Sequence, residues 1–190
     1  MELHAGSDLQ IRIYAMSNPW AAEMEYFKKN GKIDEPHLKV RSIKLYGDGS
    51  LGSRSAWLKR SYCGDETNFG LPQGDTTYFK QVCETAADLG FQLNTHCIGD
   101  SANAVFLNLY SDIVRGMDDH RWRIEHAQIV DPKDMAFFGQ YGIIPSVQPT
   151  HAISDMYMAR DRLCGDMTGA YAYQSLLNSA GMIAFGTDFP

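Results

Sequence analysis

Strand-like and helix-like segments alternate along almost the whole chain, and this alternation is what most constrains the fold. Each short β-rich run is followed by a run in which apolar residues recur at three- and four-residue spacing. We expect strands at 10–16, 39–46, 91–95, 121–125, 143–147 and 182–185, and helices at 20–30, 76–89, 101–115, 131–142 and 170–180. This order is typical of parallel strands joined by crossover helices. It leaves two α/β architectures, an open doubly wound sheet and a (β/α)₈ barrel.

Turn and cap signals refine this interpretation. Asn18 and Pro19 are typical of a helix N-cap and first helical position. Residues 47–74 are rich in Gly, Ser and charge and predict a long loop, and a second polar loop is expected after residue 147. No G-x-G-x-x-G follows any expected strand, so the nucleotide-binding form of the doubly wound sheet has no support.

Composition excludes several classes of function. The chain has 190 residues, of which 44% are apolar and 21% charged, as expected for one globular domain. The net charge is −6 and no basic stripe is present, which argues against nucleic acid as a partner. No apolar run is long enough to span a membrane, and the start shows no signal-peptide pattern. The four cysteines, which show no CxxC spacing, predict reduced, partly buried thiols and a cytoplasmic location: Cys63, Cys83, Cys97 and Cys164.

Polar side chains stand at or just after the C-terminal ends of the expected strands. The most prominent of them are Lys44, Asp48, His96, His126, Gln148, His151 and Asp188. In a parallel barrel these strand ends share one face, where barrel enzymes hold their chemistry. Imidazole and carboxylate groups together are the ligands of a catalytic zinc-type site that keeps a position open for water.

Each of these residues also has a purely structural interpretation. His96, His126 and His151 can be hydrogen-bonded or loop histidines, and Asp188 can cap a turn or a helix. Lys44 can be a solvated lysine on an edge strand. Its apolar flanks favour a buried strand, where an ammonium must pair with an acid, lose its proton or be chemically modified.

Five segments occur in the order found in a known family: IKLYGDGSLGSRSAWL, NTHCIGDSAN, RWRIEHAQIVDP, GIIPSVQPTHAISD and SLLNSAGMIAFGTDFP. From about residue 9 to the end, the chain closely resembles the amidohydrolase superfamily, specifically amidohydrolase family 3, the YtcJ-like branch that includes N-substituted formamide deformylases. The resemblance implies a (β/α)₈ TIM barrel and a metal-dependent hydrolase. Its substrate would be a small molecule with a non-peptide carbon–nitrogen amide bond, and its cofactor one or two divalent ions, Zn²⁺ above all.

The resemblance also implies roles for individual residues. His96 and His126 would be the metal ligands of the fifth and sixth strands. Asp188 would be the eighth-strand carboxylate, a metal ligand that takes the proton of the attacking water. Lys44 stands where some members carry a carboxylated lysine that bridges two metals.

Three further polar side chains in the matched segments are candidates for substrate binding, namely Asp48, Gln148 and His151. The segment 164–167 departs from the family, because a basic residue is expected there after Arg162-Leu163. Contacts of the substrate loop are therefore expected to differ from those of the family.

The chain lacks parts that the family has. No His-x-His pair exists here, although the family carries one on its first strand, and the first strand of this chain matches the third of the family. Residues 1–190 thus resemble an incomplete catalytic barrel with about strands 3 to 8, without the N-terminal strands and the small β domain. Six strands cannot close an eight-stranded barrel. We therefore expect a partial reading frame that alone is poorly soluble or associates, binds metal weakly and has little hydrolase activity.

Three functions remain open. The first is a fragment of a metal-dependent amidohydrolase, whose complete form acts on a small amide and can form a homo-oligomer. The second is a catalytically inactive, truncated chain without a complete metal site. The third is a barrel lyase with Lys44 as a Schiff-base nucleophile, which would leave His96, His126 and Asp188 without roles.

Overall fold

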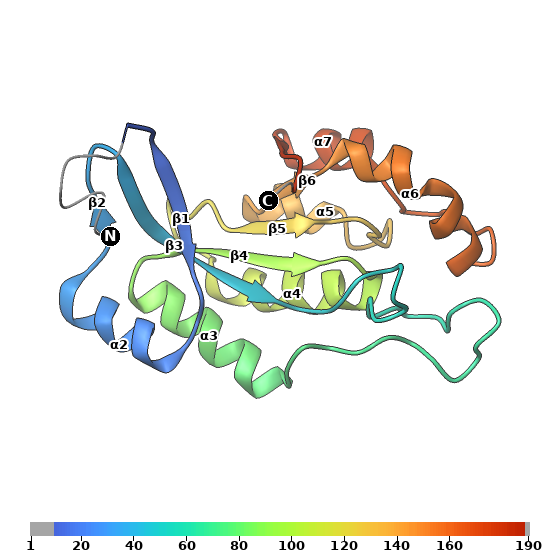
Figure 1. Cartoon of the computed structure of the whole chain (residues 1–190), viewed down its shortest axis with the longest axis horizontal. Helices are drawn as coiled ribbons and strands as arrows, with labels where there is room; N and C mark the ends of the chain where they lie inside the picture. Colours follow the sequence, from blue (N-terminus) through green and yellow to red (C-terminus); the bar gives the residue numbers. More distant parts are fainter. Residues whose placement is uncertain (1–9, 189–190) are drawn as a thin grey trace.

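The computed structural model describes residues 10–188 (Figure 1). Its strands are β1 (Ile13–Ser17), β2 (Ile33–Asp34), β3 (Leu38–Tyr46), β4 (Gln92–Cys97), β5 (Arg123–His126), β6 (Ile144–Val147) and β7 (Ala184–Phe185). Its helices are α2 (Ala21–Asn30), α3 (Thr76–Asp88), α4 (Asp100–Ile113), α5 (Ala136–Tyr141), α6 (Pro149–Arg162) and α7 (Tyr173–Ala180). All six strands and all five helices expected from the sequence are present, with shifted ends.

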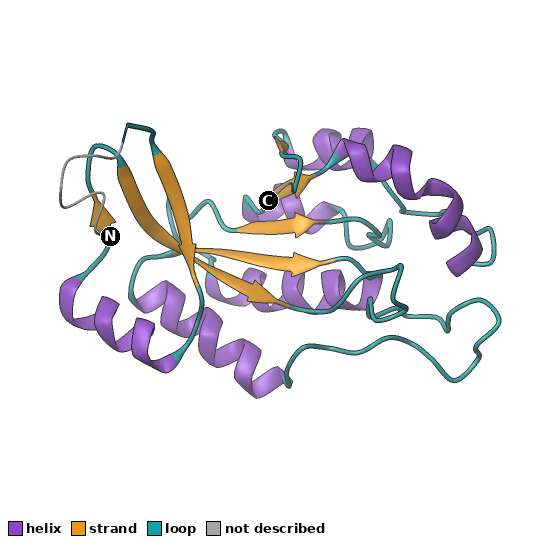
Figure 2. Ribbon diagram, in the orientation of Figure 1, coloured by secondary structure: helices purple, strands orange, loops and turns teal. Residues whose placement is uncertain are grey.

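The strands form one sheet in the order β1-β3-β4-β5-β6-β7, and β2 pairs with β3 from outside this path. Every neighbouring pair on the path is parallel, whereas β2 is antiparallel to β3. Figure 2 shows α2, α3 and α4 along one side of this sheet. Within residues 10–188, β1 and β7 are the two ends of the path and do not pair with each other. The predicted partial α/β barrel with six parallel strands is confirmed.

The core lies between the central strands and the helices that cover them. Phe79 of α3 packs its ring against Phe106 of α4 with centroids 4.8 Å apart, and Tyr110 packs edge-on against Trp122 at 4.8 Å. All four side chains are at most 1% exposed. Burial of such large rings is a major part of the stability of this layer, so the ends of β3, β4 and β5 stand on a rigid base.

Two local expectations were wrong, and one short strand was not expected. The polar loop expected after residue 147 is instead helix α6, with Pro149 in its first turn. Its exposed, mixed surface gives no clear apolar stripe, which is why the helix was not recognised. The unexpected short strand is β2. Asn18 does not cap α2, because the N-cap residue is Trp20 and no side chain bonds to the first turn.

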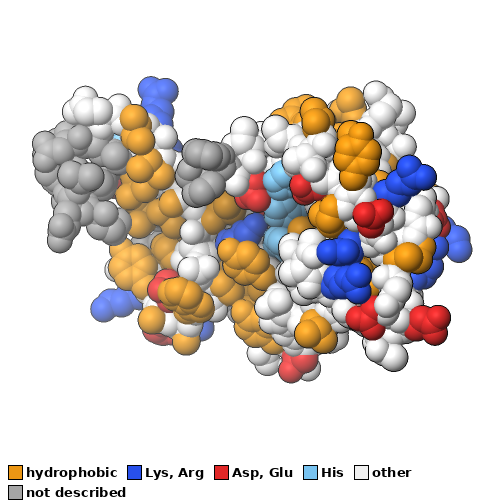
Figure 3. Space-filling view, turned by 45° about the vertical axis from the view of Figure 1, so that its right-hand side comes forward, with side chains coloured by type: hydrophobic (Ala, Val, Ile, Leu, Met, Phe, Trp, Pro, Cys, Tyr) orange, Lys and Arg blue, Asp and Glu red, His pale blue; other side chains and the backbone are white. Residues whose placement is uncertain are grey.

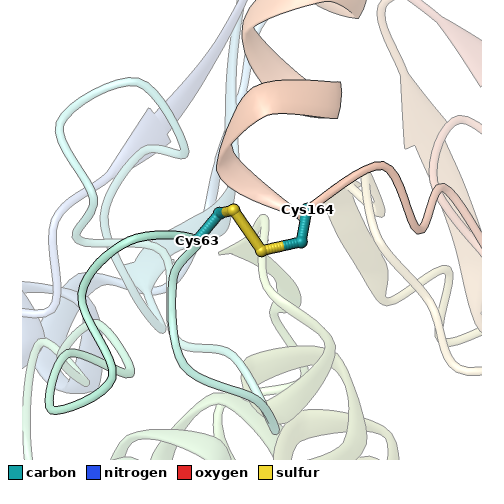
Figure 4. Close-up of a disulfide and its surroundings, with 2 residues drawn as sticks. All are labelled: Cys63 and Cys164. Carbon is teal, nitrogen blue, oxygen red and sulfur yellow. A yellow bond between two sulfur atoms is a disulfide. The ribbon is translucent and has the colours of Figure 1, made fainter.

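The prediction of four reduced cysteines was also wrong. Cys63 and Cys164 form a disulfide that joins the loop after β3 to the end of α6 (Figure 4). The two are 101 residues apart in sequence, so no local spacing could indicate the pairing. Cys83 and Cys97 are free and buried, as expected.

No helix within the described range combines the length and the apolar character needed to cross a lipid bilayer.

Candidate active site

The C-terminal ends of β3, β4 and β5 open into a cavity of about 790 Å³. Its wall is completed by the loop after β3 and by α6, toward which the arrowheads of β3 and β4 point in Figure 1. Five of the seven residues predicted from the sequence line it, namely Lys44, His96, His126, His151 and Asp188. In Figure 3, histidine side chains lie at the bottom of a hollow with acidic and basic side chains beside them.

A larger cavity, of about 930 Å³, lies at the opposite end of the strands, around residues 114–121 and 140–144. None of the seven predicted residues lines it. Since barrel enzymes place their chemistry at the C-terminal strand ends, the smaller cavity is the candidate active site.

His96 and His126 are neighbours, with ring centroids 4.5 Å apart and the rings nearly perpendicular. The Nδ1–H of His126 donates to Oε1 of Gln148 at 2.8 Å. The Nε2–H of His96 donates to the carbonyl oxygen of Gly49 at 3.1 Å. With one nitrogen of each ring fixed as a donor, the other nitrogen carries a lone pair that can bind a metal or accept a proton.

The electrostatics of the cavity keep both rings neutral. Burial and, to a smaller extent, the nearby His126 lower the pKa of His96 to about 4. Burial and, to a smaller extent, the nearby Lys44 lower the pKa of His126 to about 4. Neutral imidazole is the form that binds metals.

Lys44 lies in the same cavity, and its Nζ is 5.2 Å from the centre of the Tyr46 ring. Burial lowers the pKa of Lys44, while the carboxylates of Glu125 and Asp188 act in the opposite direction. Lys44 is half-buried and its strand β3 pairs with a strand on each side, so it is not a solvated lysine on an edge strand.

Backbone conformation directs two of the site residues. His126 has φ of 73° and Asp188 has φ of 56°, and non-glycine residues seldom occupy this left-handed region. Such conformations persist where the surrounding structure enforces them and are concentrated at functional sites. Both residues lie where a parallel strand ends, so the turn itself aims the side chain at the cavity.

Asp48 occupies a different position from the substrate contact that was expected. Its carboxyl group is 2% exposed and accepts backbone N–H bonds from Ile98 at 2.9 Å, Gly99 at 2.8 Å and Trp57 at 2.8 Å. Burial raises its pKa to about 7, against the lowering effect of these donors. Asp48 therefore ties the loop after β3 to the loop after β4 from behind the cavity.

Gln148 is likewise behind the wall, 6% exposed, where it orients His126. His151 does line the cavity, and its ring stacks on that of His126 with a centroid distance of 6.0 Å and an interplanar angle of 14°. Sequence reasoning missed Asp155 and Met158, which also line it. They lie about one and two turns beyond His151 on α6, so recognising that helix would have found them.

The two histidines suit a metal, since each presents one lone pair and is held through its other nitrogen by a protein acceptor, as metal-binding histidines are. Among residues 10–188, however, no group of three or more His, Cys, Asp or Glu side chains is arranged to hold a metal ion. Catalytic zinc sites usually have three protein ligands. The described residues thus fit two ligand positions of such a site.

Comparison with known proteins gives matches both by sequence and by structure. The model of a family described as "Amidohydrolase family" matches residues 1–190. Protein LONG AFTER FAR-RED 3 of Arabidopsis thaliana is 34% identical over 175 residues, which are 90% of this chain and 30% of that protein. YtcJ of Bacillus subtilis (strain 168), which its name assigns to the amidohydrolases, is 29% identical over 160 residues, 84% of this chain and 30% of YtcJ.

Among solved structures, an uncharacterized metal-dependent hydrolase from Pyrococcus furiosus superposes with a TM-score of 0.88 at 27% identity. The superposition covers 100% of this chain and 39% of that one. The chain thus spans about a third of the length of these relatives.

Proposed function

The chain belongs to the amidohydrolase family, and from this premise we propose that it is part of the catalytic barrel of a metal-dependent hydrolase. The proposed substrate is a small molecule with a non-peptide amide, in which a carbon–nitrogen bond is hydrolysed. The observation that carries the proposal is the pair His96 and His126, two neutral imidazoles 4.5 Å apart at the strand ends.

In this proposal His96 and His126 hold a divalent ion, with zinc as the first candidate. Such an ion, when bound, supplies Lewis acidity toward a carbonyl oxygen and toward water. Asp188, which lines the same cavity, takes the proton of the attacking water and delivers it to the departing nitrogen. His151, stacked over His126, orients the amide.

The chain is proposed to act within a longer barrel. Its sheet ends at β1 and β7, and both ends carry exposed apolar side chains, among them Tyr14 at 43%, Met16 at 42% and Phe185 at 65%. A parallel sheet is normally covered on both faces and does not expose such edges. Further strands at these edges would cover the apolar surface and bring the remaining metal ligands.

Lys44 is the proposed site of a carbamate. Burial favours its neutral amine, and a neutral amine can capture carbon dioxide to give a carboxylate-like oxygen ligand. Protein incubated with ¹³C-bicarbonate should show one carbamate carbon signal by NMR. That signal should be absent in Lys44→Arg, and its absence in the unaltered chain too would remove Lys44 from the ligand set.

The metal proposal is tested by calorimetric titration of the chain with zinc. We expect weak binding, in the micromolar range or above, because only two imidazoles contribute. His96→Ala and His126→Ala should each weaken binding at least about tenfold. His37→Ala, which removes an exposed histidine at the far end of the sheet, is the matched control and should have no effect. Equal zinc affinity in all four proteins would sink the assignment.

A second function, a chain with no activity of its own, is favoured by one observation: residues 10–188 hold no three-residue metal group. The release of amine from N-substituted formamides distinguishes this second function from the hydrolase. The zinc-supplied 190-residue chain should release little or no amine, whereas a form extended by about 60 or more barrel residues should release it. If the extended form is also silent, the chain is not part of an active hydrolase.

A cytoplasmic location remains part of the proposal. The free thiols Cys83 and Cys97 agree with it, whereas the disulfide of Cys63 and Cys164 points to an oxidising compartment.

A further inference from the structure

The outer wall of the active-site cavity is built from two segments that are distant in sequence. The loop after β3, residues 47–74, contributes Ser50, Leu51 and Gly52, and helix α6 contributes His151, Asp155 and Met158. Neither segment is a strand of the sheet. The shape of the cavity therefore depends on how firmly these two segments are held together.

Helix α6 is poorly packed for its length. Of its 14 residues, Ala159 is the one that is buried. Ile153 and Tyr157 are 74% and 72% exposed. Burial of apolar side chains is what normally fixes a helix to its domain. In α6 this packing is confined to the C-terminal half, where Met158 and Ala159 join a small apolar cluster with residues of the loop after β3, namely Leu51, Ala56, Leu58 and Tyr62.

The first residue of α6 follows Gln148, which is buried and bonded to His126. This end of the helix is thus anchored to the sheet. A helix of this length extends about 21 Å, so its other end lies far from that anchor and needs a separate attachment.

The attachment at the far end is a short seam between the loop and the residues after α6. The disulfide of Cys63 and Cys164 crosses it (Figure 4), and the backbone N–H of Cys63 donates to the carbonyl oxygen of Arg162 at 2.9 Å. An ion pair between Arg60 and Asp166 at 2.7 Å also crosses it, but both side chains are largely solvated, at 64% and 41% exposed. Exposed ion pairs contribute little, so the seam is held by the disulfide, the backbone hydrogen bond and the small apolar cluster around Ala159.

We infer that the Cys63–Cys164 disulfide is a redox-controlled clamp that holds α6 against the loop after β3 and thereby sets how far the active-site cavity is closed. It is the covalent link at the far end of a helix that buries one residue, and neither cysteine lines the cavity. The regulatory role of the clamp rests on the proposed function. The clamp itself is a property of the fold.

Opening the clamp is a two-electron thiol–disulfide exchange with a dithiol. Cys164 is the more exposed partner, so a thiolate of the dithiol attacks its sulfur, the S–S bond breaks, and Cys63 leaves as a thiolate that takes up a proton. The second thiol of the reagent then attacks the mixed disulfide and releases Cys164. The protein gains two thiols, and the dithiol is oxidised to a cyclic disulfide.

The test is hydrogen exchange measured by mass spectrometry on the full chain, with and without dithiothreitol. Reduction should speed exchange in peptides from α6 and from residues 50–65 at least about tenfold, because the link that closes a long loop is lost. Peptides from α4 should not change. The readout is independent of zinc and of hydrolysis, so failure of the clamp and failure of the proposed function are distinguishable.

Two variants complete the test. Cys63→Ser/Cys164→Ser should exchange in α6 like the reduced protein and should not respond to dithiothreitol. Arg60→Ala, which breaks the exposed ion pair in the same seam, is the matched control and should behave like the unaltered chain. If the double variant does not fold, the exchange measured in α6 on reduction of the folded, unaltered chain still tests the clamp. Unchanged exchange in α6 on reduction, an equal rise in all peptides, or four free thiols in the oxidised protein would overturn the inference.

Discussion

Helices α4 and α6 have the same length, 14 residues, but they differ in how much of each helix is buried against the rest of the molecule. Six side chains of α4 are buried, whereas α6 buries Ala159 alone. One helix is fixed along its whole length by packing. The other is held at its first turn through Gln148 and at its far end by the disulfide and the apolar cluster around Ala159. Length and helicity therefore say little about how rigidly a helix is held.

The candidate active site lies between these two regions. His96 and His126 stand on the ends of β4 and β5, while His151 stands on α6. Helix α4 packs on β4 and, through Tyr110, against Trp122 just before β5. The proposed metal ligands are thus on the rigid side and the proposed substrate contact is on the loosely held side. This division suits a site whose ligands must stay in place while substrate enters and leaves.

The largest loss of stability is expected from a substitution that disrupts the packing of α4. Phe106 in α4 is fully buried and packs against the rings of Phe79 and Tyr110. Phe106→Ala removes this packing and leaves a cavity, so we expect a loss of about 3–5 kcal/mol in the free energy of unfolding. Urea denaturation measures it. A loss below about 1 kcal/mol would mean that α4 is not the rigid scaffold.

A smaller loss of stability is expected at Asp48, which joins the loop after β3 to the loop after β4. Asp48→Ala leaves the backbone N–H groups of Trp57, Ile98 and Gly99 without their acceptor. Buried, unpaired donors destabilise, and we expect about 3 kcal/mol. Asp48→Asn keeps one oxygen acceptor and should lose less. If both variants unfold at the same urea concentration as the unaltered chain, Asp48 does not join the two loops.

The pH dependence of stability sharpens the assignment of His126. Its folded pKa of about 4 lies below the ordinary value of 6.5, so the unfolded chain binds more protons between these values and stability falls as pH falls through this window. Asp48, with a pKa raised to about 7, acts in the opposite direction. It is present both in the unaltered chain and in the His126→Gln variant with which that chain is compared below.

His126→Gln removes the titrating ring and keeps an amide that can donate to Gln148. Between pH 7 and pH 5 the unaltered chain should therefore lose about 2 kcal/mol more stability than this variant. Urea titrations at the two pH values measure the difference. Parallel pH profiles for the two proteins would show that His126 is not buried as a neutral ring.

The smallest expected effect is on α6. Tyr157 is 72% exposed, and substitutions at such surface positions usually change stability by less than about 0.5 kcal/mol. Tyr157→Ala should therefore unfold at nearly the same urea concentration as the unaltered chain. A loss of the size expected for Phe106→Ala would mean that the exposed face of α6 contributes to packing and that its contrast with α4 is false.

The contrast also explains what the sequence could reveal. The apolar spacing of α4 is the result of its burial, so the helix was predicted. In α6, little is buried, so no apolar stripe marks the helix and the sequence predicts a loop there. Periodicity reports packing against a core, and an element that hardly packs leaves no such pattern.

The same reasoning applies to the site. Lys44, His96, His126 and Asp188 were expected together because the ends of parallel strands share one face, and the structure places them in one cavity. Their catalytic and ligand roles stay predictions. The positions of Asp48 and Gln148 behind the wall, and the disulfide across 101 residues, depend on hydrogen-bond directions and long-range approach that no local pattern encodes.

The central claim is that His96 and His126 form a metal-binding pair on a rigid base. Long-range ¹H–¹⁵N correlation of the imidazole nitrogens, recorded during addition of zinc, tests it residue by residue. The account predicts that the Nε2 signal of His126 and the Nδ1 signal of His96 shift together with zinc. The Nδ1–H of His126, bonded to Gln148, should remain, and exposed His37 should not move. Zinc that shifts His37 as much as this pair, or leaves the pair unmoved, would contradict the account.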